Sequence, residues 1–258
     1  MDLELRDKVV LVTGGSDGLG RALSGRLVAE GAKVALCARG EERLRAVADG
    51  LRRDGGDVLD VVADVSRADD LVAFTESALD RFGRIDGVVS NAGRSAAIPV
   101  LDATDELWED DLNLKLLAAV RLARLAGPHL QATGGAVVNV LAIGAKAPGP
   151  GSTPSSVSRA AGMALTKALS KELGPSGVRV NAVLIGLIES GQWDRMAAAS
   201  STAVDDLYAS MAASSGIPLG RVGRAEEFAD LAAYLLSARS SYVTGTAINL
   251  DGGLSPAV

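Results

Sequence analysis

The chain has 258 residues, with 26 basic and 32 acidic side chains and a formal net charge of −6. This acidic balance argues against a general nucleic-acid binder and against binding to an anionic membrane surface, because both partners present phosphate groups. Hydrophobic residues make up 48% and charged residues 22%, a balance that excludes a disordered chain. The length is that of one large α/β domain or of two small domains.

The single cysteine, Cys37, excludes an internal disulfide framework, and the single histidine, His129, excludes a metal site built on two histidines. We therefore predict no metal ion. The N-terminus lacks the basic and apolar segments of a signal peptide, and no apolar run reaches the roughly 18 residues of a membrane span. We expect a cytoplasmic protein that acts on a small molecule and contacts neither nucleic acid nor membrane.

Short apolar segments alternate with segments of helical periodicity along the whole chain. In chain order we predict strand 9–12, helix 21–30, strand 34–37, helix 41–53, strand 58–62, helix 69–82, strand 85–90, helix 105–126, strand 136–141, helix 155–173, strand 178–184, helix 225–237 and strand 247–250. Continuous apolar strands separated by helices predict an α/β fold: a Rossmann-type, doubly wound parallel sheet of seven strands with helices on both faces.

No linker interrupts this order, so we expect a single domain over residues 1–258. Within it, residues 189–220 are rich in alanine and serine and carry only a weak pattern. A long irregular segment after a late strand is typical of a lid, and we expect this one to cover the substrate.

A glycine-rich segment (residues 13–20, TGGSDGLG) follows the first predicted strand and precedes the first predicted helix. Glycines there permit a tight turn and a close approach of the backbone to a pyrophosphate. The start of the helix then supplies free N–H groups and a positive dipole end. It is this placement, more than the glycines themselves, that favours a bound nucleotide over a ligand-free turn.

The Thr-Gly-x-x-x-Gly-x-Gly spacing resembles the short-chain dehydrogenase/reductase family, and further family motifs follow in order over essentially the whole chain. They are Asp64-Val65, Asn91-Ala92-Gly93, Asn113, VNAV at 180–183, Gly245 and DGG at 251–253. The resemblance implies one NAD(P)-binding Rossmann domain and an oxidoreductase activity. The expected cofactor-binding residues are Gly14, Ser16, Asp17, Gly18, Leu19, Gly20, Arg39, Asp64, Val65, Asn91, Ala92, Gly93, Arg159, Gly186, Ile188 and Ser190.

The end of the second predicted strand indicates which nucleotide is preferred. NAD enzymes of this layout place an acidic residue there to hold the ribose hydroxyls. Here the position is Ala38, and Arg39 follows it with a guanidinium suited to a 2′-phosphate. We therefore expect NADP(H) to be favoured over NAD(H), although Asp17 argues the other way and Arg39 as a merely solvated charge is the alternative.

The resemblance implies hydride transfer at the nicotinamide, with a tyrosine that moves the proton, a lysine four residues later and a serine that orients the substrate. Aligned on the flanking segments, these positions are occupied by Ser155, Arg159 and Ala142, and only Asn113 of the usual four residues remains. A serine hydroxyl is shorter and far less acidic than a phenol, and arginine keeps its proton near neutrality.

We therefore predict that Ser155 is not the proton donor and that Arg159 anchors the cofactor ribose. The candidate catalytic residues are Asn113, Ser155, Arg159 and Tyr208, the last as a donor from the lid or simply a surface tyrosine. The candidate substrate residues are Arg94, Lys146 and Trp193, for which a solvated loop lysine and lid packing are the alternatives at the last two.

Three functions remain open at this point. The first is an NAD(P)-dependent short-chain oxidoreductase with a non-standard proton-transfer site, acting on a carbonyl or hydroxyl of an acidic or acyl-thioester substrate. The second is an inactive NADP(H)-binding pseudoenzyme or regulatory subunit, and the third is a hydratase or isomerase that uses the same pocket. We also expect a homo-oligomer, a tetramer, because helices 105–126 and 155–173 carry the interfaces in the family that the chain resembles.

Overall fold

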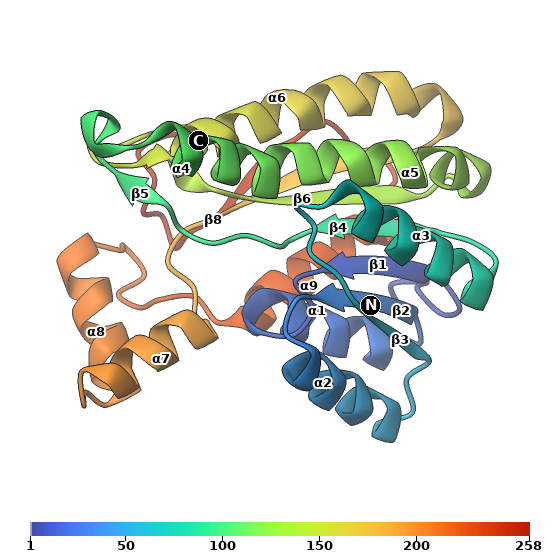
Figure 1. Ribbon diagram of the computed structural model, residues 1–258, viewed down its shortest axis with the longest axis horizontal. Coiled ribbons are helices and arrows are strands. Elements are labelled where there is room, and N and C mark those ends of the chain that lie inside the picture. Colours follow the sequence, from blue (N-terminus) through green and yellow to red (C-terminus); the bar gives the residue numbers. More distant parts are fainter. Residues whose placement is uncertain (1) are drawn as a thin grey trace.

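A computed structural model of the protein describes residues 2–258, the side chains of Gln192 and Asp194 excepted. Seven strands form one parallel sheet in the order β3-β2-β1-β4-β6-β8-β9 (Figure 1). They are β1 (Val9–Thr13), β2 (Lys33–Ala38), β3 (Val58–Val62), β4 (Gly87–Ser90), β6 (Ala136–Ala142), β8 (Arg179–Ile185) and β9 (Ala247–Leu250). The predicted doubly wound α/β fold is confirmed.

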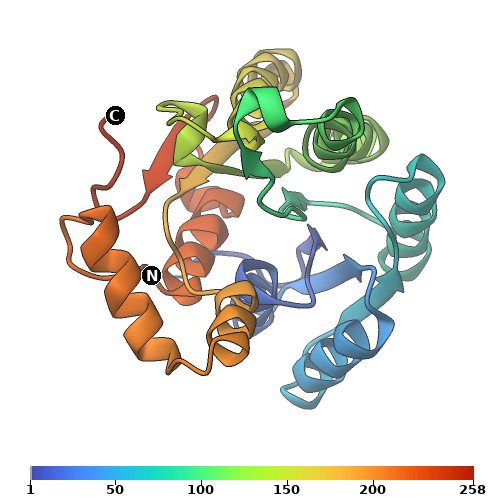
Figure 2. The same cartoon turned by 60° about the vertical axis from the view of Figure 1, so that its left-hand side comes forward.

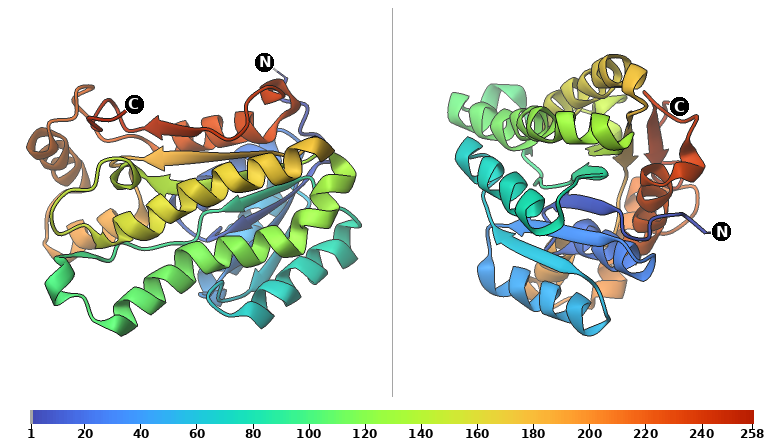
Figure 3. Two further views of the ribbon diagram at one scale, coloured as in Figure 1. Left: turned by 90° about the horizontal axis from the view of Figure 1, so that it is seen from above. Right: turned by 90° about the vertical axis from the view of Figure 1, so that its right-hand side faces the viewer.

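Helices cover both faces of this sheet (Figure 3). One face carries α1 (Gly18–Ala29), α2 (Glu41–Arg53) and α9 (Ala225–Leu236), and the other carries α3 (Ala68–Phe82), α5 (Ala118–Thr133) and α6 (Ser155–Leu173). The bounds of α2 and α6 are those predicted, and those of α1, α3 and α9 differ by at most three residues.

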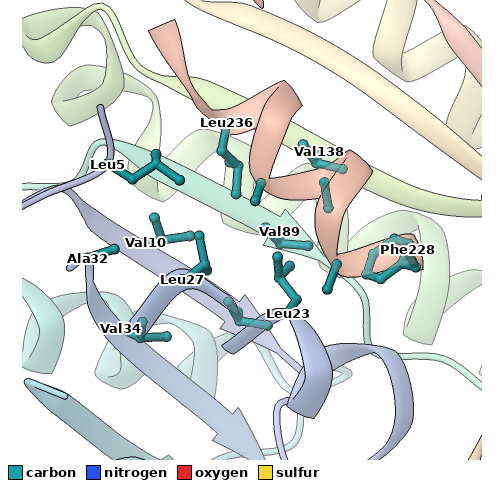
Figure 4. Packing of buried hydrophobic residues seen from close by; sticks show 14 of the residues in the cluster. Leu5, Val10, Leu23, Leu27, Ala32, Val34, Val89, Val138, Phe228 and Leu236 are labelled. Atoms are coloured by element: carbon teal, nitrogen blue, oxygen red, sulfur yellow. The ribbon is translucent and has the colours of Figure 1, made fainter. Parts of the chain in front are cut away.

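The core is built from alternating side chains of the strands. In β1, Val10 and Val12 pack toward α1 and α9, whereas Val9 and Leu11 pack toward α3 and α5, so every residue of the strand is buried. Figure 4 shows the first of these two layers, in which Val10 lies among side chains of α1 and α9. Each fully buried leucine or valine stabilises the fold by about 1.5–3 kcal/mol.

The predicted helix 105–126 is longer and less regular than expected. It consists of α4 (Asp105–Leu112), a π-helical turn η2 (Asn113–Leu117) and α5, which ends at Thr133 and contains Pro128. In η2 the backbone N–H of Ala118 donates to the carbonyl of Asn113, a bond that spans five residues. Such turns often occur at functional sites because they redirect the side chains on either side.

The sequence analysis expected an irregular segment at 189–220, but most of this segment is helical. It forms α7 (Gly191–Ala199) and α8 (Val204–Ser215), which lie side by side at one end of the sheet (Figure 2). Alanine is the strongest helix former, so this composition stabilises helices even without a clear apolar stripe. A short antiparallel pair, β5 (Ala97–Ile98) with β7 (Thr153–Pro154), was also not foreseen. No helix within residues 2–258 is long and apolar enough to cross a membrane.

Candidate active site

A cleft of about 940 Å³ opens where the strand order reverses, between β1 and β4. In open α/β sheets this switch point at the carboxyl ends of the strands is where ligands bind. Most of the predicted cofactor residues line the cleft: Gly14, Ser16, Asp17, Gly18, Leu19, Arg39, Asp64, Val65, Asn91, Ala92, Gly93, Arg159 and Ser190. The structure therefore brings together residues that the sequence spreads over almost 180 positions.

The glycine-rich loop is held open by backbone contacts. The N–H groups of Gly14 and Gly15 donate to the carbonyl of Cys37 at 2.8 and 3.1 Å, which fixes the loop to the end of β2. A Cβ on Gly20 would lie 2.3 Å from the Gly14 carbonyl oxygen, so only glycine permits this turn to close against α1. The N-terminus of α1 then faces the cleft with its positive dipole end, a site suited to a pyrophosphate.

Asn91 supports the same loop from β4. Its side-chain Nδ2 donates to the Thr13 carbonyl at 2.8 Å, and its backbone N–H donates to the Thr13 hydroxyl at 2.9 Å. The same hydroxyl accepts the N–H of Ala92 at 3.0 Å. These bonds tie the ends of β1 and β4 together and leave the neighbouring backbone open to a ligand.

Two arginines stand at the end of the cleft formed by β2 and α2. Arg39 is 68% exposed, and its Nη1 lies 4.0 Å from the Asp64 carboxylate. Arg43 also lines the cleft, one turn into α2. Ala38 ends β2, so this position carries no carboxylate, whereas Glu41 and Glu42 at the start of α2 also line the cleft.

Asp17 links three segments across the mouth of the cleft. Its Oδ2 accepts hydrogen bonds from Arg43 of α2 at 3.2 Å and from Arg195 of α7 at 2.9 Å, and its Oδ1 caps α1 at Gly18. Partial burial would raise the pKa of Asp17, but these hydrogen bonds and the two positive charges hold it below its usual value. The carboxylate is therefore ionised and keeps both arginines beside the phosphate-binding loop.

Several predicted residues lie elsewhere. Gly20 closes the loop from behind, Gly186 packs on Asp251, and Ile188 is buried at a bridge to Gly223. Trp193 lies in α7 and does not line the cleft.

Three further polar candidates do not line the cleft themselves, although one of them, Tyr208, contacts Ser190, which does. Asn113 Oδ1 accepts from Arg121 at 2.6 Å. Lys146 Nζ donates to Ala247 O and Asn249 Oδ1, both at 2.9 Å, and so points toward β9. The Tyr208 hydroxyl accepts the Ser190 N–H at 3.3 Å.

The three positions expected to replace the family's catalytic residues lie close to one another in the fold. Ala142 ends β6, Ser155 begins α6, and Arg159 follows one turn later. The Arg159 guanidinium donates to the Val140 carbonyl, and burial lowers its pKa to about 10. A Cβ on Gly93 would come within 2.9 Å of Arg159 Nη2, so the glycine leaves the space that this side chain occupies in the cleft wall.

A buried charged cluster beside Ser155 was missed by the sequence analysis. Lys115 of η2 forms an ion pair with Asp111 of α4, and the two side chains are only 2% and 1% exposed. Lys115 Nζ also donates to Ser155 Oγ at 2.7 Å, and Ser158 Oγ donates to Asp111 Oδ2 at 2.6 Å. The only signal in the sequence was an acid and a lysine four residues apart, which is usually a surface pair.

Comparison with known proteins defines the family. The sequence profile described as enoyl-(acyl carrier protein) reductase matches residues 14–255. The chain belongs to the short-chain dehydrogenase/reductase family. A putative ketoacyl reductase of the monensin polyketide synthase from Streptomyces virginiae is 37% identical over 254 residues, which are 96% of this chain and 97% of that protein.

Two solved structures extend the comparison. A short-chain oxidoreductase from Pseudomonas aeruginosa, bound to NADPH and described as containing an atypical catalytic center, is 37% identical with a TM-score of 0.92 and covers 98% of this chain and 100% of its own. L-sorbose reductase from Gluconobacter frateurii, complexed with NADPH and L-sorbose, is 32% identical with a TM-score of 0.94, over 100% of both chains. The protein is thus an oxidoreductase of the short-chain type. Among residues 2–258, no cluster of three or more His, Cys, Asp or Glu is suited to hold a metal ion.

Proposed function

We propose that this short-chain oxidoreductase binds NADP(H) and reduces a ketone to an alcohol. The observation that carries the proposal is the cleft at the β1–β4 switch point, with the glycine loop at one wall and Arg39 at the end of β2. The same cleft holds backbone donors for a pyrophosphate and a guanidinium for a third phosphate.

The residues present fit this cofactor. The α1 N-terminus faces the place of the pyrophosphate, and the missing side chain of Gly20 allows the loop to close beneath it. Arg39 and Arg43 would contact the 2′-phosphate, and Asp64 with Val65 would border the adenine. Arg159 would hold the nicotinamide ribose, since its side chain stands in the cleft wall beside Gly93. When bound, NADPH supplies the hydride that a carbonyl carbon accepts.

The substrate class we propose is an acyl chain that carries a ketone. The monensin and granaticin relatives are named ketoacyl reductases, and another relative, from Streptomyces virginiae, is named a gamma-butyrolactone 1'-reductase. Arg94 lines the cleft, and its side chain is 53% exposed in a surface ion pair with Asp110, so it can also contact an acidic or phosphate-bearing carrier at the mouth. We propose that α7 and α8 close over this substrate as a lid.

The test is consumption of NADPH, followed by its absorbance, with a panel of carbonyl compounds. The panel contains a 3-ketoacyl thioester, a simple cyclic ketone, a ketose and a small diketone. We expect the ketoacyl thioester to be reduced fastest and NADPH to be used in preference to NADH. Tight NADPH binding by calorimetry with no oxidation across the panel would contradict the reductase proposal and support a nucleotide-binding pseudoenzyme.

A further inference from the structure

The ion pair of Lys115 with Asp111 is buried deeply enough to need an explanation beyond stability. Both side chains are almost fully inaccessible, and they lie under the start of α6 rather than at the surface. Removing two charges from water costs several kcal/mol for each ion, and a buried pair is therefore weak evidence for a stabilising role.

The hydrogen bonds of Ser155 show what this pair contacts. Ser155 Oγ accepts the Ala96 N–H at 2.9 Å and a Lys115 Nζ–H at 2.7 Å. A hydroxyl has two acceptor positions and one proton, so both acceptor positions are used and only the Oγ–H remains to be donated. No acceptor for that proton is recorded among the side chains and backbone groups that the structure describes.

Ser155 lies on the same side of α6 as Arg159, next to residues that line the cleft, although it is not itself among them. The two residues are four apart, so they occupy one face of the helix, and Arg159 lines the cleft. Ala96, the other contact of Ser155, follows Gly93 and Arg94, which also line it. Lys115 and Arg159 further share the wall of a small inner cavity of about 20 Å³, enough for one water molecule.

We propose that Ser155 donates the proton to the substrate oxygen and that Lys115 returns a proton to Ser155, an inference that rests on the proposed reductase function. As the carbonyl carbon accepts hydride, the π electrons move onto the carbonyl oxygen. That oxygen bonds the Ser155 proton, the Ser155 oxygen takes a proton from Lys115 Nζ, and Lys115 is left as a neutral amine. Water then reprotonates the amine, so that atoms and charge balance over one turnover.

The surroundings of Lys115 suit this role. Burial lowers the pKa of Lys115, the hydrogen bond to Asp111 opposes that effect, and the positive charges of Arg159 and Arg94 lower it again. Lys115 therefore releases its proton more readily than an exposed lysine. Arg94 is paired with Asp110, but Lys115 and Arg159 together face a single buried carboxylate, and the net positive charge stabilises an oxyanion as it forms.

The sequence alone argued against Ser155 because a serine hydroxyl is a weak acid. The contact with Lys115 removes that objection, since the ammonium can supply a proton while the hydroxyl gives up its own. Ser158, one turn further along α6, donates a hydrogen bond to Asp111. The same helix therefore positions both the proposed proton donor, Ser155, and the carboxylate of the ion pair.

Substitutions separate a proton relay from a structural ion pair. Lys115→Arg keeps a positive charge for Asp111 but does not release protons near neutrality. Ser155→Ala removes the donor, and Lys167→Met on the exposed side of α6 is the control. With the carbonyl of the panel that reacts fastest, we expect kcat to fall about 10²–10⁴-fold in Ser155→Ala and Lys115→Arg, the contribution of a general acid. The control should stay within about twofold, and the Kd for NADPH should change little in any of the three.

The pH dependence of the reduction rate is a second test of the proton relay. The reduction rate of the unsubstituted protein should fall as the pH rises through the pKa of Lys115, and Lys115→Arg should lose this dependence. If NADPH is oxidised by a carbonyl and Ser155→Ala keeps more than about a tenth of the rate, the relay is wrong while the reductase function stands. If no carbonyl is reduced, the reductase function itself fails.

The relay can also be tested without a substrate. The chain has six lysines, so their side-chain ammonium signals can be followed by nuclear magnetic resonance of protein labelled at lysine, with Lys115→Arg to assign the signal. We expect Lys115 to titrate at a lower pH than the other five. Ser155→Ala should lower its pKa further, because a hydrogen bond to the charged form is lost. A Lys115 that titrates with the other lysines, or that is unaffected by Ser155→Ala, would overturn the proposal.

Discussion

We expect the preference for NADPH over NADH to depend mainly on Arg39, the more exposed of two arginines at this end of the cleft. Arg39→Ala removes the side chain that follows β2 and leaves the glycine loop and α1 untouched. A hydrogen bond to a charged group contributes about 1.5–3 kcal/mol, and because Arg39 is 68% exposed we expect the lower end of that range. This corresponds to a roughly tenfold rise in the Kd for NADPH. The Kd for NADH should not change, because NADH has no phosphate at that position.

Isothermal calorimetry with both nucleotides measures this effect directly. Arg45→Ala is the matched control, since Arg45 lies nearby on α2, pairs with Glu41 and does not line the cleft. A phosphate monoester has its second pKa near 6, so the preference for NADPH should also shrink as the pH falls below about 6. The substitution Ala38→Asp combined with Arg39→Ala should reverse the preference.

Two results would refute this reasoning. Equal affinity of the unsubstituted protein for the two nucleotides would show that Arg39 does not contact the phosphate. A loss of affinity in Arg39→Ala that is the same for NADH and NADPH would show that the side chain acts on the loop or on Asp64 instead.

Three further outcomes follow from particular contacts. Asp17→Asn keeps the cap of α1 but removes a negative charge beside the phosphate-binding loop. NADPH should therefore bind about 3- to 10-fold tighter by calorimetry at low salt. Weaker binding would show instead that the carboxylate positions Arg195 for the cofactor. The protein should be a tetramer by light scattering. Ala164→Arg, on the exposed face of α6, should reduce the mass of the oligomer by disrupting subunit contacts. A monomer of the unsubstituted protein at micromolar concentration contradicts the expectation. Hydrogen bonds from Arg221 and the start of α9 lower the pKa of Glu227 to about 2, so its stabilisation is complete above pH 4.5 and is lost as the pH falls toward 2. Glu227→Gln should therefore cost about 1 kcal/mol in urea unfolding at pH 7, with a difference that narrows in acid; an unchanged difference at pH 3 would be inconsistent with this linkage.

The nucleotide half of the site could be predicted from the sequence because backbone geometry dominates it. The loop at 13–20 must use glycine where a Cβ would meet the backbone, and its place between β1 and α1 follows from the order of elements alone. Asn91 could be predicted for a related reason, since β4 lies next to β1 in the strand order of the dinucleotide-binding doubly wound sheet.

The proton-transfer half could not be predicted in the same way. Lys115 and Ser155 are 40 residues apart, and their contact depends on how α4 and η2 pack against the start of α6. A lysine and an aspartate four residues apart carry no mark of burial in a sequence. For Lys146 the sequence places the backbone after β6, but it could not show that the side chain donates to Ala247 and Asn249 of β9; its role toward a substrate stays a prediction.

On the proposed mechanism, with Ser155 as the donor in the place of a phenol, the range of substrates that can react is also restricted. The serine hydroxyl ends close to the backbone of α6, so a carbonyl oxygen must come within about 3 Å of Ser155 Oγ, near that helix, to receive the proton. Ala142 offers no hydroxyl to hold a carbonyl that arrives from another direction. A slender acyl chain with its ketone at a fixed distance from a bound carrier meets this requirement, whereas a bulky ring does not. On the proposed mechanism, the replacement of the family's acid–base residues makes the enzyme slow on generic ketones and selective for a substrate that other groups hold in position.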